Sequence, residues 1–212
     1  MLGKSISKNS ILLALFAVVT TAVIASTYLG TREKIRDNIR HAEAKALLAI
    51  IPEDRHDNDM LDNARFISDQ EFLGLREAKR YYQAKQQNKV VAVILPATAR
   101  DGYTGDIDLI VGINRDGSVA GVRVLSHRET PGLGDQVDYQ KSQWVDGFAN
   151  KSLGNPTESR WTVKKDGGVF DQFTGATITP RAVSHSVYRA LKYFEANRQT
   201  LLDLAPTSGA DT

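Results

Sequence analysis

The stretch DIDLIVGINRDGSVAGVRVLS, Asp106–Ser126, determines the fold prediction. Two β-rich runs, Asp106–Ile113 and Ser118–Ser126, flank the turn NRDG at positions 114–117. A short turn that ends in Asp-Gly between two such runs is typical of a β-hairpin. The sequence therefore predicts two antiparallel strands in the middle of the chain.

Further elements extend from this hairpin in both directions. VVAVIL at Val90–Leu95 predicts a strand that ends at Pro96, and Trp161–Lys165 is a fourth candidate strand. Apolar residues recur at helical spacing from Pro180 to about Leu204, which predicts a long last helix. Strands followed by a helix that covers them indicate an α+β domain with an antiparallel sheet and packed helices.

The beginning of the chain predicts a single membrane-spanning helix. Residues Ile11–Leu29 carry no charge and have about the length of a bilayer-crossing helix. The alternative is a cleavable signal peptide with a cut after Ala25, but the apolar stretch is longer than a usual signal core. A retained anchor is therefore favoured, and an export signal of either kind places the folded domain outside the cytoplasm.

Four segments are expected: a membrane anchor, a helical stalk with a connector, the folded domain and a loose tail, at residues 1–30, 31–88, 89–204 and 205–212. In the second segment, Arg32–Ile50 has helical periodicity and ends before Pro52, and Glu71–Gln87 has a helix-forming composition.

Composition excludes several classes of chemistry. The net charge is +2, from 27 basic and 25 acidic side chains, and no basic stripe interleaved with aromatics is present, which argues against nucleic-acid binding. The chain has no cysteine, which excludes disulfides, thiolate nucleophiles and iron–sulfur ligation. The four histidines are widely spaced, so no metal site is expected. Any redox chemistry therefore requires a bound organic cofactor.

The first loop whose residues could take part in chemistry is HRETPGLGDQV, His127–Val137, directly after the hairpin. Its Gly-x-Gly is not a dinucleotide fingerprint, because Val137 stands where the third glycine belongs. His127 and Glu129 form a candidate acid–base pair, although such a pair on a loop is more often solvated surface.

The second loop is DQFTGATITP, Asp171–Pro180. Its plain interpretation is a helix start, with Thr179 at the N-cap and Pro180 at the first helical position. The same helix terminus favours a phosphate, which the threonine hydroxyls could bind or carry as an ester. No base adjoins these threonines in the sequence, so covalent attachment would need a separate enzyme.

Both loops resemble signatures of one family. DQFTGATITP resembles the Asp-x-x-(Ser/Thr)-Gly-Ala-Thr-x-Thr flavinylation motif of the FMN-binding domain family, and ETPGLG, Glu129–Gly134, resembles its other signature. This family occurs in the C subunit of the sodium-pumping NADH:quinone reductase and in the G subunit of the Rnf/Rsx electron transport complex. The order of the parts and the short chain are most similar to the G subunit.

The resemblance implies covalent FMN, joined through its phosphate to Thr179 by a periplasmic FAD-dependent flavin transferase. The residues implied to be read by the transferase are Asp171, Thr174, Gly175, Ala176, Thr177 and Thr179. The residues implied to contact the cofactor are Glu129, Thr130, Gly132, Leu133, Gly134, Thr174, Gly175, Ala176 and Thr177. Trp144 and Tyr103 are candidate stacking partners, although such aromatics more commonly pack in a core.

The implied function is an electron carrier of the bacterial inner membrane, single-pass, with its FMN domain on the periplasmic side. Other membrane subunits would be its partners and would supply the ion path, and the chain would contribute no catalytic residue. Three alternatives stay open: the C subunit of a sodium-pumping reductase, a stand-alone periplasmic flavin reductase that uses His127 and Glu129, and a cofactor-free scaffold in which the second loop only caps a helix.

Overall fold

A computed structural model describes residues 2–203, with side chains from residue 7 onward. The expected loose tail at 205–212 lies outside the described residues. The chain divides into two compact units, Met1–Lys45 and Ala46–Thr212, and each is described by itself.

The first unit is a single helix. Helix α1 covers Leu2–Leu48, and its last residues belong to the second unit. Its 47 residues correspond to roughly 70 Å, more than twice the thickness of a hydrocarbon core. By length and composition it is apolar enough to cross a membrane. The hydroxyls of Thr20, Thr27 and Thr31 each donate to the carbonyl oxygen four residues earlier, at 2.8 Å, so these groups need no water.

The second unit contains a five-stranded antiparallel sheet in which the strands follow their order in the sequence. The strands are β1 (Arg65–Ile67), β2 (Lys79–Gln86), β3 (Lys89–Ala99), β4 (Ile107–Asn114) and β5 (Val119–Ser126). The predicted hairpin is confirmed as β4–β5. Its turn is closed by a bond from Gly117 N–H to Asn114 O (2.9 Å), and Gly117 adopts a φ of 90° that glycine tolerates best.

The helix expected at Glu71–Gln87 is wrong, because β2 occupies the second half of this range. The lysine- and glutamine-rich composition favours a helix, but both faces of this strand are buried. Tyr81 packs in the core cluster on one face of the sheet, whereas Tyr82 and Ala84 pack in the cluster on the other. Tertiary burial therefore overrides the helical propensity.

Strand β3 continues past Pro96, where the sequence predicted its end. Its pairing with β2 stops at Ile94, and two residues beyond Pro96 the N–H of Thr98 points to the carbonyl of Leu73 rather than to β4. Backbone N–H groups alternate in direction along a strand, so the nitrogens of residues 96 and 98 face the same side. The nitrogen of Pro96 therefore faces away from β4, and its missing N–H removes no hydrogen bond to β4.

Trp161–Lys165 does not form a strand, and the prediction was wrong here too. The segment has one isolated bridge, Val163 to Phe170, between the short 3₁₀-helices η4 (Glu158–Arg160) and η5 (Lys164–Asp166). Its apolar character reflects an aromatic cluster, in which Trp161 is 1% exposed and contacts Phe148 and Phe170. The other 3₁₀-helices are η1 (Glu53–Arg55), η2 (Gly134–Val137) and η3 (Trp144–Phe148).

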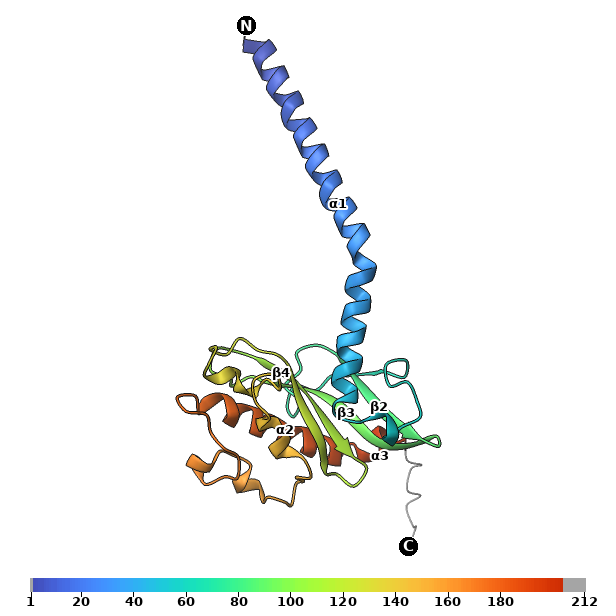
Figure 1. The fold of residues 1–212 in the computed structure, drawn as a ribbon, viewed down its shortest axis with the longest axis vertical. Coiled ribbons are helices and arrows are strands. Elements are labelled where there is room, and N and C mark those ends of the chain that lie inside the picture. The colour runs from blue at the N-terminus through green and yellow to red at the C-terminus, as the bar shows by residue number, and fades with distance from the viewer. Residues whose placement is uncertain (1, 204–212) are drawn as a thin grey trace. The chain divides into compact units, whose positions relative to one another are not determined.

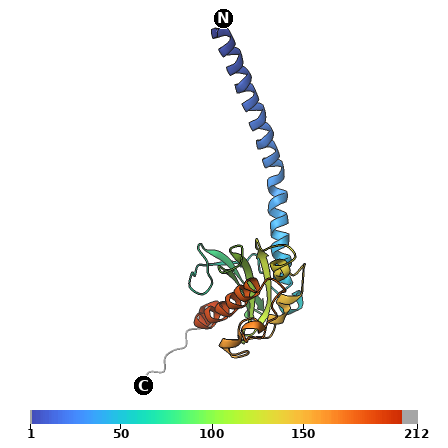
Figure 2. The ribbon, with the colours of Figure 1, turned by 90° about the vertical axis from the view of Figure 1, so that its left-hand side faces the viewer.

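The sheet is covered on both faces. Helix α2 (Ile178–Ala196), followed by the short α3 (Arg198–Leu201), lies across one face (Figure 1 and Figure 2). It buries one apolar stripe against the sheet, made of Val183, Val187, Leu191 and Phe194. The other face is covered by Leu47, Ile50 and Ile51. The predicted α+β fold, with an antiparallel sheet and packed helices, is confirmed.

Candidate cofactor site

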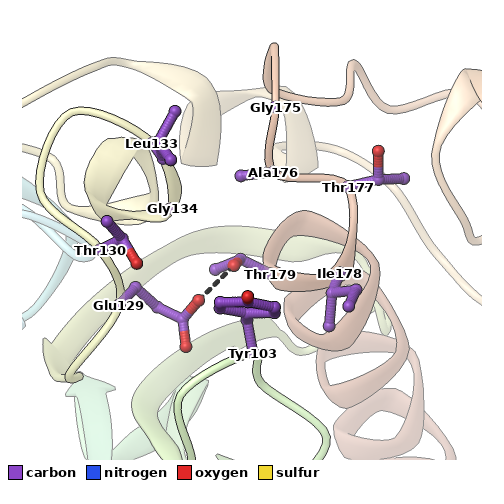
Figure 3. A pocket seen from close by; sticks show the side chains of 10 residues that line it. All are labelled: Tyr103, Glu129, Thr130, Leu133, Gly134, Gly175, Ala176, Thr177, Ile178 and Thr179. Atoms are coloured by element: carbon purple, nitrogen blue, oxygen red, sulfur yellow. Dashed lines mark hydrogen bonds between the residues drawn. The ribbon is translucent and has the colours of Figure 1, made fainter.

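A cavity of about 330 Å³ opens where three segments meet. They are the β3–β4 loop, the loop after β5 and the opening of α2 (Figure 3). The lining consists of Tyr103, Glu129, Thr130, Leu133, Gly134, Gly175, Ala176, Thr177, Ile178 and Thr179. The structure thus brings the two loops identified in the sequence to one place.

The loop after β5 folds back on itself. The carbonyl oxygen of Thr130 accepts the N–H groups of Leu133 and Gly134, both at 3.1 Å, and Gly132 adopts a φ of 79°. Gly132 supplies the left-handed turn that a β-carbon would disfavour. The turn places Glu129 and Gly134 against the same cavity.

Gly134 has a different role, because its backbone lies close to the side chains of Glu129 and Thr179. A β-carbon at this position would lie 2.8 Å from both Glu129 Oε2 and Thr179 Oγ1. Real β-carbons essentially never make such contacts, so a side chain here would displace one of the two groups.

The second loop reaches the first at Gly175. Its φ is 80°, and the N–H of Ala176 donates to Phe173 O at 3.1 Å. A β-carbon on Gly175 would lie 3.3 Å from Leu133 Cδ2, so the two loops are close to contact.

Helix α2 begins at Ile178, two residues earlier than the sequence indicated. Thr177 occupies the N-cap position without a side-chain capping bond, so the expected N-cap role of Thr179 is wrong. Thr179 and Pro180 are the second and third helical residues. Proline is tolerated there, because N–H groups of the first turn have no intrahelical acceptor. The Thr179 side chain, freed from capping, turns inward and is 1% exposed.

Thr179 and Glu129 form a buried hydrogen bond across 50 residues of sequence. Thr179 Oγ1 donates to Glu129 Oε2, and the two side chains point toward each other in Figure 3. Glu129 is 4% exposed, and its Oε1 accepts the backbone N–H and the hydroxyl of Thr104 at 3.0 and 3.1 Å. The expectation that no base adjoins the threonine is therefore wrong in three dimensions. No signal in the sequence identifies Thr104.

His127 and Glu129 do not form the acid–base pair considered from the sequence. The His127 ring accepts the backbone N–H of Glu129 through Nδ1 at 3.1 Å, while the Glu129 carboxylate faces Thr179 and Thr104. His127 therefore helps to fix the loop.

Four of the residues that the family resemblance implied lie outside the cavity lining. Gly132 and Thr174 sit in the two turns without lining the cavity. Asp171 is exposed, and its carboxylate binds Lys164 Nζ at 2.6 Å. The Trp144 ring is half-buried and packs edge-on against Phe148 and Phe173 of the core.

Three large apolar side chains at the cavity are solvent-exposed. Tyr103 is 65% exposed, Ile178 42% and Leu133 40%, and all three line the cavity. Ile178 was missed, because it occupies the variable position of its motif. Exposed apolar side chains beside a helix N-terminus suit a ligand with a flat apolar part and an anionic part. Within residues 2–203, no group of three or more side chains is placed to hold a metal ion.

Family models match both parts of the chain. A model described as FMN-binding domain matches residues 102–192, which include both loops of the cavity. A model described as RnfG N-terminal region matches residues 1–50.

Curated relatives match nearly the whole chain. A protein of Pseudomonas aeruginosa strain UCBPP-PA14, named as the G subunit of an ion-translocating oxidoreductase complex, is 46% identical over 207 residues, covering 98% of this chain and 96% of the relative. A protein of the same name from Shewanella loihica is 48% identical over 200 residues and covers 94% of both chains. A solved structure, Shewanella oneidensis NqrC, is 20% identical with a TM-score of 0.46, covering 70% of this chain and 72% of that one.

Proposed function

The chain belongs to the G-subunit family of the ion-translocating oxidoreductase complex, and from this premise we propose that it carries its FMN covalently on Thr179. It has the FMN-binding domain of this family and the role of an FMN-containing electron-transport subunit. The two relatives described above match 98% and 94% of this chain and are named as G subunits, so the alternative of a C subunit is not favoured.

The observation that carries the proposal is the position of Thr179. Its side chain lines the cavity from the first turn of α2. The N–H groups of a first helical turn and the positive end of the helix dipole stabilise a phosphate. A phosphodiester on Thr179 would retain one negative charge at the end of the helix that favours it.

The remaining lining fits the other part of FMN. Tyr103, Leu133 and Ile178 offer apolar surface for an isoalloxazine ring, and the cavity volume lies at the lower end of the range of small-molecule sites. Gly175 leaves backbone accessible at the cavity. FMN supplies the redox chemistry, and the chain's own residues bind it, orient it and limit its contact with water.

Maturation and location follow from the same proposal. An FAD-dependent flavin transferase attaches the FMN and reads Asp171 to Thr179, of which Asp171 and Thr174 are exposed. Helix α1 holds the chain in the bacterial inner membrane, and the FMN domain lies in the periplasm. The other subunits exchange electrons with the FMN and form the ion path, since one helix encloses no path by itself.

A stand-alone flavin reductase is a weaker interpretation. Substrate turnover would require an acid–base pair beside the flavin, and the His127 ring is instead occupied by the backbone N–H of Glu129. No second function is favoured by a specific contact.

Intact mass tests the proposal. The full chain is made in a host with the transferase, alongside Thr179→Ala and the control variant Thr157→Ala, an exposed threonine outside both loops. We expect one FMN less one water on the wild type and on Thr157→Ala, and none on Thr179→Ala. An unmodified wild type, with the transferase active on a control substrate, would refute covalent attachment.

A further inference from the structure

The contact between Glu129 and Thr179 has a chemical consequence beyond holding the site together. A threonine hydroxyl is a weak nucleophile, and an adjacent base is the usual means of activating it. Within the described residues, Glu129 is the carboxylate that accepts the Thr179 hydroxyl proton in a hydrogen bond, and the contact is buried. A carboxylate of the chain itself therefore contacts the hydroxyl that would be modified.

We propose that Glu129 is the general base for attachment of FMN to Thr179. This inference rests on the proposed function. Thr179 Oγ1 attacks the flavin-side phosphorus of FAD, forming the Oγ1–P bond while the P–O bond to the bridging oxygen breaks. AMP leaves with that oxygen, and the hydroxyl proton passes to Glu129 Oε2 and then to solvent. No electron is gained or lost, and the transferase binds FAD and presents its phosphate.

The surroundings of Glu129 fit this role. Its Oε1 is held by two bonds from Thr104, which leaves Oε2 directed at Thr179. Gly134 has no β-carbon that would separate the pair. The base is thus oriented by a partner that does not take part in the reaction, as general-base catalysis requires.

The contact also explains how a single threonine is selected. The motif region contains Thr174, Thr177 and Thr179. Thr174 is exposed and Thr177 half-buried, and the hydroxyl of Thr179 is bonded to the carboxylate. Site selection would then depend partly on this chain's fold.

The rate of flavinylation tests the proposal. Full-length chain is purified in detergent from a host without the transferase and incubated with purified transferase and FAD, and FMN incorporation is followed by intact mass. Glu129→Gln keeps the shape of the side chain but cannot take the proton. We expect kcat to fall by about 100-fold or more with little change in KM for the chain, since a general base contributes about 10²–10⁴-fold.

Two further Glu129 variants and a control variant separate an effect on chemistry from an effect on structure. Glu129→Asp keeps the carboxylate and should retain more of the rate than Glu129→Gln, and formate should accelerate Glu129→Ala by replacing the lost base. Asp138→Asn, directly after this loop and outside the cavity lining, is the control and should react at the wild-type rate. Unfolding midpoints verify that each variant is folded at the assay temperature.

The proposal is overturned if Glu129→Gln reacts within a few-fold of wild type, if its defect is confined to KM, or if formate leaves Glu129→Ala unchanged. These outcomes differ from failure of the proposed function, in which the wild-type chain itself acquires no FMN.

Discussion

At the scale of single residues, Gly134 is the position on which the site depends most sensitively. The hydrogen-bonded side chains of Glu129 and Thr179 fill the space that a side chain at position 134 would need. A single methyl group would therefore have to displace a buried carboxylate or a buried hydroxyl.

We predict that Gly134→Ala lowers the free energy of unfolding by about 1–3 kcal/mol, as overpacking of a buried site commonly does. It should also slow FMN incorporation, because the base and the nucleophile are pushed apart. Gly147→Ala is the control, since a β-carbon at Gly147 meets nothing within 4 Å. Chemical denaturation and intact mass measure the two effects, and equal behaviour of both variants would contradict the packing argument.

The sequence predicted much of the site at this scale, but not its central contact. Both loops are continuous motifs, so most residues of the lining could be named in advance. Glu129 and Thr179 meet only because β5 and α2 end at the same cavity, and Thr104 enters from a third segment. Short-range patterns carry no information about such pairings.

At the scale of elements, the outer face of β4 and β5 is shaped to receive the segment after α1. Gly112 and Gly121 are paired across these two strands, and Ile50 packs over them. Arg123 of β5 donates from Nη2 to the carbonyl oxygen of Ala49 at 3.2 Å. The segment is thus held by apolar packing and by a bond to one of its carbonyl groups.

The two glycines give a matched pair of substitutions. A β-carbon at Gly112 would lie 2.1 Å from Ile50 Cγ2, whereas at Gly121 it would lie 3.5 Å away, an ordinary contact. We predict that Gly112→Ala destabilises the domain by about 1–3 kcal/mol and that Gly121→Ala has a much smaller effect. Thermal unfolding of both variants tests this, and the reverse order would be inconsistent with the observed packing.

A polar network joins three strands at the end of the sheet. Asp108 of β4 accepts bonds from Lys79 Nζ (2.8 Å) and Thr98 Oγ1 (2.7 Å). Burial acts to raise the pKa of Asp108, but the bonds from Lys79 and Thr98 outweigh it and hold the pKa below its ordinary value.

This lowered pKa predicts a pH dependence. The unfolded carboxyl titrates near about pH 4, so the stabilisation is present above that pH and is lost as the pH falls through the lower folded-state pKa. Asp108→Asn should therefore destabilise at pH 7 by less than about 1 kcal/mol, because the group is partly exposed, and the difference from wild type should vanish in acid. A difference in unfolding midpoint that stays constant from pH 7 to pH 3 would exclude this explanation.

The element predictions failed where burial, not local composition, determined the structure. The hairpin and α2 have strong local signals, a Gly-containing turn and a helical apolar stripe, and both were found. Strand β2 was missed because its two tyrosines pack in the cores on opposite faces of the sheet. The segment that begins at Trp161 was predicted as a strand because aromatic residues are common in strands, whereas here the ring packs in an aromatic cluster.

At the scale of the whole molecule, the chain combines a long apolar helix with an FMN-binding domain. The absence of cysteine from the sequence makes the proposed orientation open to a direct test, since any introduced cysteine is a unique reporter.

We predict that Ser159→Cys, on the exposed surface of the domain, is labelled by a membrane-impermeant maleimide in cells whose outer membrane has been made permeable. Asn9→Cys, before the apolar stretch, should be labelled only after lysis. The opposite pattern would place the domain in the cytoplasm and contradict the proposed periplasmic location.

Fragmentation mass spectrometry of the chain from native membranes can identify the residue that carries the FMN. Trypsin should release the peptide Asp166–Arg181, which contains all three threonines of the second loop. We predict that this peptide carries FMN less one water on Thr179. An unmodified peptide, or FMN on Thr174 or Thr177, would contradict it.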